Sequence, residues 1–285
     1  MAKARTTGIE WTEHTWNPFA GCSIHTPGCT NCYAMRQARR MEEFGTSPTY
    51  AGTTRIANGK PIWTGKINKA SAATMKRPFQ ITSPSMIFVN SMSDFWHEGA
   101  RDEWRIEALG VMAATSHVYQ VLTKRPENIL PFLEKHTLHI PAQVWIGATV
   151  ERGDFKHRID TLRRVPAAIR FLSVEPLIGE VGRLDLTGIH WVIGGGESGP
   201  GARGMRADWA RELRDECTRQ GVAFFWKQWG KAINNPIYHD SPTRDCPLTG
   251  AARVEALDPV GKGGSKIDGQ EWKEYPDYAP QRPLF

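Results

Sequence analysis

From residue 85 onward, short runs of β-branched and aromatic residues alternate with longer stretches in which apolar residues recur every three or four positions. This alternation predicts strands that are each followed by a helix, and therefore a parallel sheet with helices outside it. The strand runs are apolar throughout, as expected of strands buried on both faces. The predicted strands are residues 86–90, 119–122, 144–148, 170–174, 190–193 and 223–226.

Two helices are predicted from apolar stripes that follow an aspartate able to cap the first turn. The first stripe consists of Phe155, Ile159 and Leu162 behind Asp154. The second consists of Trp209, Leu213 and Cys217, with Asp208 as the cap and Gly221 as the stop. We expect both helices to pack outside the sheet, with Cys217 as a buried apolar side chain.

The N-terminal stretch predicts one more strand–helix unit, with a strand near residues 9–12 and a helix over about 32–44. Seven strands are one fewer than a closed eight-stranded barrel requires, so the predicted α/β fold is an incomplete (β/α) TIM-like barrel over residues 1–235. The turn-rich residues 236–285 predict an irregular C-terminal extension, with room for a short hairpin.

The basic charge is concentrated in a predicted insertion at about residues 45–82. The chain has 36 Lys and Arg against 30 Asp and Glu, and the segment between Phe44 and Ser93 holds no acidic residue. Asn58–Gly59 inside it predicts a hairpin turn. Such a segment can follow a phosphate backbone and stack bases, or it can be a solvated loop. The nucleic-acid candidates are Arg55, Lys60, Trp63, Lys66, Lys69, Lys76 and Arg77.

Composition excludes several classes of protein. With 40% hydrophobic and 23% charged residues the chain can bury a sizeable core. It has no apolar run of about 18 residues, and its first residues lack the apolar region of a signal peptide. We therefore expect a cytoplasmic protein that does not contact a membrane.

Three of the five cysteines, Cys22, Cys29 and Cys32, lie in a loop of the predicted barrel at residues 20–34 with the spacing C-x6-C-x2-C. Three thiols cannot pair off among themselves, and a chain of this length does not need disulfides, so a bound metal is favoured. A zinc ion would need a fourth ligand, for which His14 and His25 are near in sequence. A [4Fe–4S] cluster on three cysteines would instead leave one iron open. Cys246 is interpreted as an incidental thiol.

Polar residues follow the predicted strands at their carboxyl ends, which in barrels of this kind face the site. Six strands ending in this way indicate a polar ligand at the mouth of the barrel. After the sixth, the GGGESG run offers backbone N–H groups to an anion or a ribose, or forms a tight turn. The strand-end residues are Ser91, Ser93, Asp94, Thr123, Lys124, Arg125, Thr149, Glu151, Ser173, Glu175, Gly195, Gly196, Glu197, Ser198, Lys227 and Gln228.

Lys124 and Arg125 can bind a carboxylate or a phosphate, or they can be a solvated pair before Pro126. Glu175 would need a cationic partner if it is buried in the mouth, and Lys227 is the candidate.

The chain resembles the phage-associated three-Cys-motif family that is grouped with the radical S-adenosylmethionine superfamily. The stretches that carry the resemblance are TWNPFAGCSIHTPGCTNCYA, FVNSMSDFWHE, VLTKRP, RFLSVEPLIG, WVIGGGESGPGARGM and FFWKQWG. The usual superfamily spacing is C-x3-C-x2-C, whereas six residues separate Cys22 from Cys29 here. The aromatic that normally precedes the last cysteine is replaced by Asn31, with Tyr33 just after it.

The resemblance implies a [4Fe–4S] cluster and S-adenosylmethionine as cofactors, with an electron donor such as flavodoxin or ferredoxin. Reduction would cleave the sulfonium bond and give a 5′-deoxyadenosyl radical that abstracts a substrate hydrogen, while the protein supplies orientation and a dry cavity. Asp94 would accept from the methionyl amino group. The candidates for cofactor binding are Tyr33, Ser91, Ser93, Asp94, Lys124, Thr149, Glu151, Ser173, Glu175, Gly195, Gly196 and Glu197. Together with the basic insertion, this predicts modification or repair of a nucleic acid or nucleotide.

Two other readings of the sequence stay open. One is a non-catalytic protein that binds DNA or RNA and whose zinc ion or structural cluster only holds the N-terminal loop. The other is a radical enzyme that acts on a peptide or a small metabolite, with the basic insertion as a docking surface. Iron and sulfide content separates the first of these from the enzyme.

Overall fold

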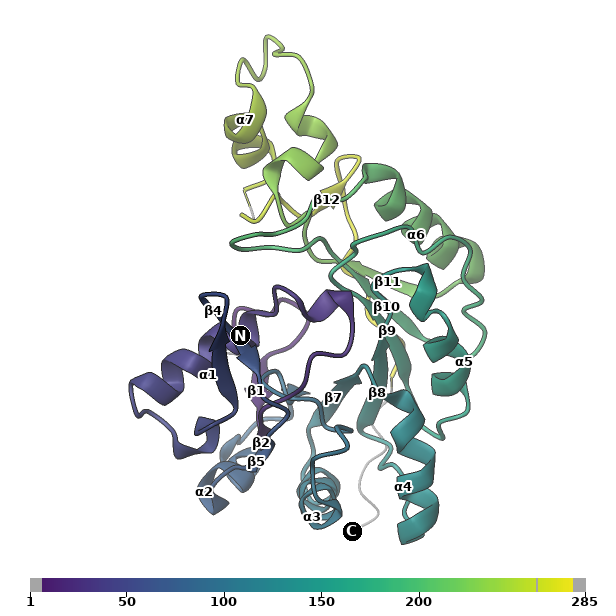
Figure 1. Cartoon of the computed structure of the whole chain (residues 1–285). Helices are drawn as coiled ribbons and strands as arrows, with labels where there is room; N and C mark the ends of the chain where they lie inside the picture. Colours follow the sequence, from purple (N-terminus) through teal and green to yellow (C-terminus); the bar gives the residue numbers. More distant parts are fainter. Residues whose placement is uncertain (1–6, 260, 279–285) are drawn as a thin grey trace. The chain divides into compact units, whose positions relative to one another are not determined.

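The computed structural model describes residues 7–259 and 261–278, and its main feature is a parallel sheet of seven strands (Figure 1). The strand order follows the chain, β1-β6-β7-β8-β9-β10-β11, which is the order of a (β/α) barrel with one strand fewer than eight. The mixed α/β fold with a parallel sheet is therefore confirmed. The strands are β1 (His14–Trp16), β6 (Met86–Val89), β7 (Val118–Thr123), β8 (Val144–Thr149), β9 (Arg170–Val174), β10 (Trp191–Gly194) and β11 (Ala223–Trp226).

The first strand lies later than the sequence predicted, at His14–Trp16 instead of residues 9–12. This strand pairs with β6, with Trp16 opposite Val89. Trp11, which lies within the predicted range, is buried in a turn, and its ring lies 4.7 Å from that of Phe88. Burial of Trp11 therefore did not require a strand, and the prediction was wrong there.

The described chain divides into two compact units. The first comprises residues 7–148, 161–170 and 278, and the second comprises residues 149–160 and 171–277.

In the first unit, helix α1 (Tyr33–Glu43) packs on a hairpin made of β3 (Thr54–Ala57) and β4 (Lys60–Trp63). The hairpin turns at Asn58 and Gly59, whose φ angles are +48° and +71°, as the sequence predicted. Tyr50, Trp63 and the buried side of α1 form one apolar cluster. The basic insertion is thus a folded part of this unit.

The first unit also contains a small second sheet and three further helices. A two-stranded sheet joins β2 (Phe19–Ala20) to β5 (Asn68–Lys69), so the insertion is paired to the chain just before the cysteine loop. The remaining helices are α2 (Ala72–Met75), α3 (Asp102–Ala113) and α4 (Ile129–His136).

In the second unit, helix α6 (Ala207–Gln220) packs against β10 and β11 through the buried Leu213 and Cys217. The predicted stop is confirmed, because Gly221 ends the helix with a left-handed backbone. The predicted cap is not, because Asp208 lies in the first turn and pairs with Arg206.

Helix α5 (His157–Arg163) also begins later than predicted. A 3-10 turn over Gly153–Phe155 precedes it and takes up Asp154, whose carboxylate pairs with Arg152. Asp154 is therefore not the cap of this helix. Ile159 and Leu162 of the predicted stripe are buried, and Phe155 is half-buried.

The C-terminal segment contains helix α7 (Gly250–Leu257), which was not predicted, and the short hairpin β12 (Lys266–Ile267) and β13 (Gln270–Glu271), which was. Residues after the hairpin line β11, where the amide of Trp226 donates to the carbonyl of Trp272 at 2.8 Å. The aromatic cluster Phe224, Phe225, Trp226 and Trp229 is buried core. Among the described helices, none has the length and apolar character needed to cross a membrane.

Candidate functional site

The cysteine loop lies over the carboxyl end of β6. The amide of Gly21 donates to the carbonyl of Met92 at 3.3 Å, and at the other end of the loop the hydroxyl of Tyr33 donates to the carbonyl of Ser91 at 3.0 Å. Gly21 has a φ of +99°, and a Cβ there would lie 2.0 Å from the carbonyl oxygen of Lys66. Only glycine allows the insertion to approach the loop so closely.

The three cysteine side chains have different local surroundings. Cys22 and Cys32 pack against the apolar cluster under α1. Cys29 is buried at the end of a 3-10 turn, with its sulfur 3.7 Å from the hydroxyl oxygen of Thr26. Cys32 immediately precedes α1, so the amides of Ala34 and Met35 in the first turn stabilise its thiolate.

The pKa of Cys22 is raised to about 12, first by burial and then by the charges of Asp94, Cys29 and Cys32, while Arg125 acts in the opposite direction. The pKa of Cys32 is also raised, first by burial and then by Cys29, while Lys124 lowers it. The thiols thus lie within electrostatic range of one another, and a metal that bound them would have to replace their protons.

The arrangement of the three thiols bears on which metal group the loop could hold. Within residues 7–259 and 261–278, no three Cys, His, Asp or Glu side chains are arranged to hold one ion. A zinc ion needs three or four such ligands around one point. A [4Fe–4S] cluster binds its cysteines through separate irons, so its three thiols need only surround it.

Asp94, the predicted acceptor for an amino group, is already engaged by the protein. It is buried, and one carboxylate oxygen accepts from the hydroxyl of Thr123 at 2.6 Å and the amide of Trp96 at 3.0 Å. The other accepts from the amide of Lys124 and from Arg125, each at 3.1 Å. With four donors in place, this carboxylate is a structural acceptor and is not open to a ligand's ammonium group.

Two polar side chains at the same strand end have no hydrogen-bond partner among the described residues. Asn90 is 3% exposed, and neither its amide nitrogen nor its amide oxygen has a hydrogen-bond partner; the buried hydroxyl of Ser93 has none either. Asn90 has a φ of +60° and begins the turn that leads to Ser93, next to the cysteine loop. Buried polar atoms without partners are costly, so this position suits a bound polar molecule. Ser91, by contrast, donates to Asn17 at 3.2 Å.

In the second unit, the candidates Thr149, Glu151 and Ser173 are buried. Glu151 pairs with Arg158, whose guanidinium also donates to the carbonyl of Thr149 at 2.7 Å. The carbonyl of Ser173 accepts from the amide of Val150 at 2.9 Å. These residues join the loop after β8 to the next strand.

The glycine run after β10 is required by close packing. A Cβ at Gly196 would lie 2.1 Å from the carbonyl oxygen of Trp229, and one at Gly195 would lie 2.9 Å from the carboxylate of Glu175. Glu175 pairs with Lys227 at 3.1 Å, the partner expected from the sequence. Glu197 and the guanidinium of Arg203 form a two-point ion pair.

The basic residues of the insertion are not equivalent. Trp63 is buried under α1, so its ring is not exposed for stacking on a base. Lys69 pairs with Glu107 on α3, and the ammonium group of Lys66 donates to the carbonyl of Ala51 at 3.0 Å. All six basic residues of the predicted set are exposed, and Trp63 is its buried member.

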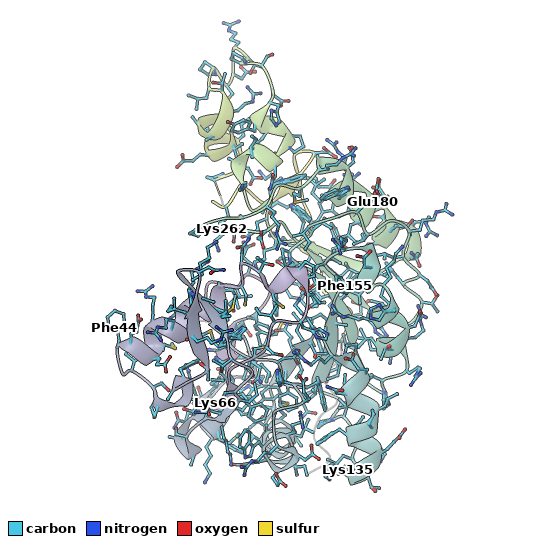
Figure 2. The ribbon with its side chains drawn as sticks, viewed as in Figure 1. Phe44, Lys66, Lys135, Phe155, Glu180 and Lys262 are labelled. Carbon is cyan, nitrogen blue, oxygen red and sulfur yellow. The ribbon has the colours of Figure 1, made fainter. Side chains whose placement is uncertain are left out.

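The hairpin end of the unit also carries exposed apolar groups. Phe44, at the end of α1, is 72% exposed, and Figure 2 shows it at the outer end of this helix. Ile56 on β3 is 51% exposed.

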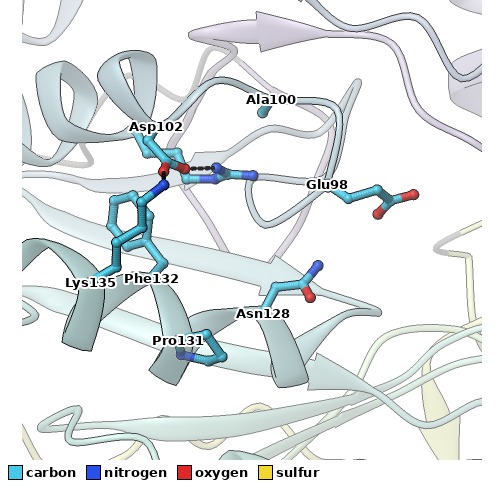
Figure 3. Close-up of a pocket in the computed structure, with 8 residues that line it drawn as sticks. Glu98, Ala100, Asp102, Asn128, Pro131, Phe132 and Lys135 are labelled. Carbon is cyan, nitrogen blue, oxygen red and sulfur yellow. Dashed lines mark hydrogen bonds and ion pairs between the residues drawn. The ribbon is translucent and has the colours of Figure 1, made fainter.

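A pocket of about 260 Å³ opens in the first unit between α3 and α4 (Figure 3). Asp102 lies in its wall and bonds to Lys135 at 2.7 Å and to Arg105 at 2.9 Å. With Glu98, the pocket lining carries two carboxylates against two cations, so it has no net charge to attract a charged ligand. Glu98, which also lines it, connects to the cysteine site through Arg125 at 2.8 Å.

Comparison with known families gives one match. Residues 6–276 match the family described as "Protein of unknown function (DUF5131)". The chain belongs to the DUF5131 family. No curated protein and no solved structure matches it.

In this DUF5131 chain, sequence reasoning missed three residues near the thiols. Ser23 and His97 were not predicted as site residues, yet their side chains meet at 2.9 Å. Asn90 was assigned to a strand, although an asparagine at the end of an apolar run is a signal for a left-handed turn.

Proposed function

We propose that this protein is a radical S-adenosylmethionine enzyme that carries a [4Fe–4S] cluster on Cys22, Cys29 and Cys32 and acts on a nucleic acid or nucleotide. The observation that carries the proposal is the placement of Cys22, Cys29 and Cys32 on one loop over the carboxyl end of a strand in a parallel sheet, within electrostatic range of one another. That end of the sheet is where such folds place their chemistry. When bound, the cluster would supply the electron that splits the sulfonium of S-adenosylmethionine.

The residues around the thiols would prepare the site in three ways. The apolar cluster beneath α1 excludes water from one side of Cys22 and Cys32. The first turn of α1 and Lys124 favour the charged form of Cys32, which is the form that binds metal. Asn90 and Ser93 offer a buried amide and a hydroxyl to a polar ligand beside the thiols.

The preference for a nucleic acid rests on the hairpin of the insertion. Its exposed Arg55 and Lys60 lie in the same unit as the cysteine loop, and the amide of Gly65 donates to the carbonyl of Cys22 at 3.1 Å. A phosphate backbone held by this hairpin would therefore lie near the thiol site.

Iron and sulfide analysis after anaerobic reconstitution of the full chain tests the proposal. About four iron and four sulfide atoms per chain are expected, with 5′-deoxyadenosine formed from S-adenosylmethionine under reducing conditions. Replacing Cys22, Cys29 or Cys32 by Ala should remove most of the iron. The matched control is Cys246→Ala, which removes a buried thiol outside the loop.

Each other result has a definite meaning. One zinc per chain without iron would show that the metal is structural and would overturn the proposal of a radical enzyme. A full cluster with no 5′-deoxyadenosine across DNA, RNA, nucleotide and peptide substrates would overturn the radical reaction and leave a structural cluster.

A further inference from the structure

Ser23, the residue after Cys22, receives hydrogen bonds from two buried side chains. The guanidinium of Arg125 donates to its hydroxyl oxygen at 2.6 Å, and Nε2 of His97 lies 2.9 Å from the same oxygen. The other ring nitrogen of His97, Nδ1, accepts from the amide of Gly99 at 2.9 Å. Because an amide can only donate, Nδ1 is unprotonated and the ring proton is on Nε2, which donates to Ser23.

Both acceptor positions of the Ser23 hydroxyl are thus filled, and only its O–H remains to donate. A hydroxyl that accepts from a cation and from an N–H group is polarised and becomes a stronger donor. This arrangement also excludes the reverse role, in which histidine would take a proton from the serine.

Arg125 cannot easily move away from Ser23, because its other contacts hold it. It is 3% exposed, and its guanidinium also donates to Asp94 at 3.1 Å and to Glu98 at 2.8 Å. Its amide donates to the hydroxyl of Thr123 at 2.9 Å, at the end of β7. The planar fork of arginine suits three simultaneous contacts, which lysine could not reproduce.

We infer that Arg125, after β7, and His97, after β6, anchor the cysteine loop to the ends of these two strands through Ser23, and that they orient the Ser23 hydroxyl as a donor to an anionic group bound at the thiols. Arg125 and His97 are positioning residues, since they act through Ser23. The inference deepens the proposed function, because the anchor determines where Cys22 lies when a cluster binds.

Hydrogen–deuterium exchange of the full chain, purified without added iron, tests the anchor independently of any cofactor. Ser23→Ala should increase the exchange rate of the amides in residues 21–32 by about tenfold or more, with little change in the melting temperature. Arg125→Lys should have the same local effect, because it keeps the charge and loses the fork. Ser23→Thr keeps the hydroxyl and should restore the wild-type rate.

The matched control is Thr30→Ala, which removes a hydroxyl of the same loop that donates only to the carbonyl of Pro27. It should leave exchange in residues 21–32 within twofold of the wild type. Equal exchange in Ser23→Ala and the wild type would overturn the anchor. This result is distinct from a failure of the proposed function, which would appear as absence of iron with the anchor intact.

The donor role has its own measurement in the reconstituted protein. A hydrogen bond to a cluster or its ligand makes the reduction potential less negative. Ser23→Ala should therefore give a more negative potential than the wild type, and Ser23→Thr should restore it. An unchanged potential in Ser23→Ala would overturn the donor role.

Discussion

Glu151 and Arg158 form an ion pair that is almost completely removed from solvent, with 0% and 3% of their side chains exposed and Oε2 3.0 Å from Nη1. Such a pair gains little over apolar residues of similar size, because both charges lose their hydration. Removal of only one partner is strongly destabilising, since it leaves the other charge buried without its counter-charge.

We therefore expect Glu151→Ala to lower the free energy of unfolding by about 3–5 kcal/mol. The double substitution Glu151→Leu with Arg158→Met should lose less than the single one, because both charges of the pair are removed and Arg203, the other cation near Glu151, keeps its ion pair with Glu197. Urea unfolding curves of the full chain measure both. A double variant that is less stable than the single variant would contradict this account.

The close approach at Gly21 gives a second prediction. A Cβ at this position would meet the carbonyl oxygen of Lys66 at 2.0 Å, and the φ of +99° is unfavourable for alanine. Gly21→Ala should cost at least about 2 kcal/mol of stability. The control is Gly45→Ala, at a φ of +61° with nothing within 4 Å of a Cβ, which should cost about 1 kcal/mol. Equal losses in urea unfolding would show that the chain relaxes around the Gly21 contact.

Asp102 predicts how stability depends on pH. Hydrogen bonds from Lys135 and His136 lower the pKa of this carboxyl from its usual 3.8 to about 2. The stabilisation is therefore present above about pH 4 and is lost as the pH falls towards 2. Because the group is partly solvated, we expect Asp102→Asn to lower stability by only about 1 kcal/mol at pH 6.5.

The difference between wild type and Asp102→Asn should shrink when urea midpoints are compared at pH 6.5 and pH 3.0. Glu103→Gln, an exposed neighbour on α3, serves as the control and should show no such change. A constant difference across this range would indicate that the effect of Asp102 is not electrostatic.

Salt dependence tests the nucleic-acid surface. Each phosphate contact adds about 0.9 to the slope of log affinity against log salt on duplex DNA. The double substitution Arg55→Ala with Lys60→Ala should reduce this slope by about 2 and weaken binding to all sequences alike. Lys69→Ala is the control, because Lys69 already pairs with Glu107. Absence of binding at low salt would reject a nucleic-acid partner.

The strands could be predicted because burial on both faces requires apolar runs, and six of the seven were located within two residues. β1 was missed because His14 and Thr15 are polar and half-buried, so its pairing with β6 leaves no apolar signature. Helix caps failed at Asp154 and Asp208, because arginines two residues away hold both carboxylates.

The thiols could be found from their spacing, but their surroundings could not. The pairing of Asp94 with Arg125 depends on the register between β6 and β7, which places residues 31 apart in the sequence together. The burial of Trp63 depends on how the hairpin packs on α1. Both contacts depend on how distant segments pack together, which the local sequence does not determine.

The hydrogen bond from the amide of Gly65 to the carbonyl of Cys22 links the backbone of the insertion directly to the residue that carries the first thiol. A ligand that displaces the hairpin would therefore also displace the backbone of Cys22. A ligand that reduces the mobility of the cysteine loop would also reduce that of the hairpin. Ligand binding at the hairpin and the conformation of the cysteine loop would then be coupled.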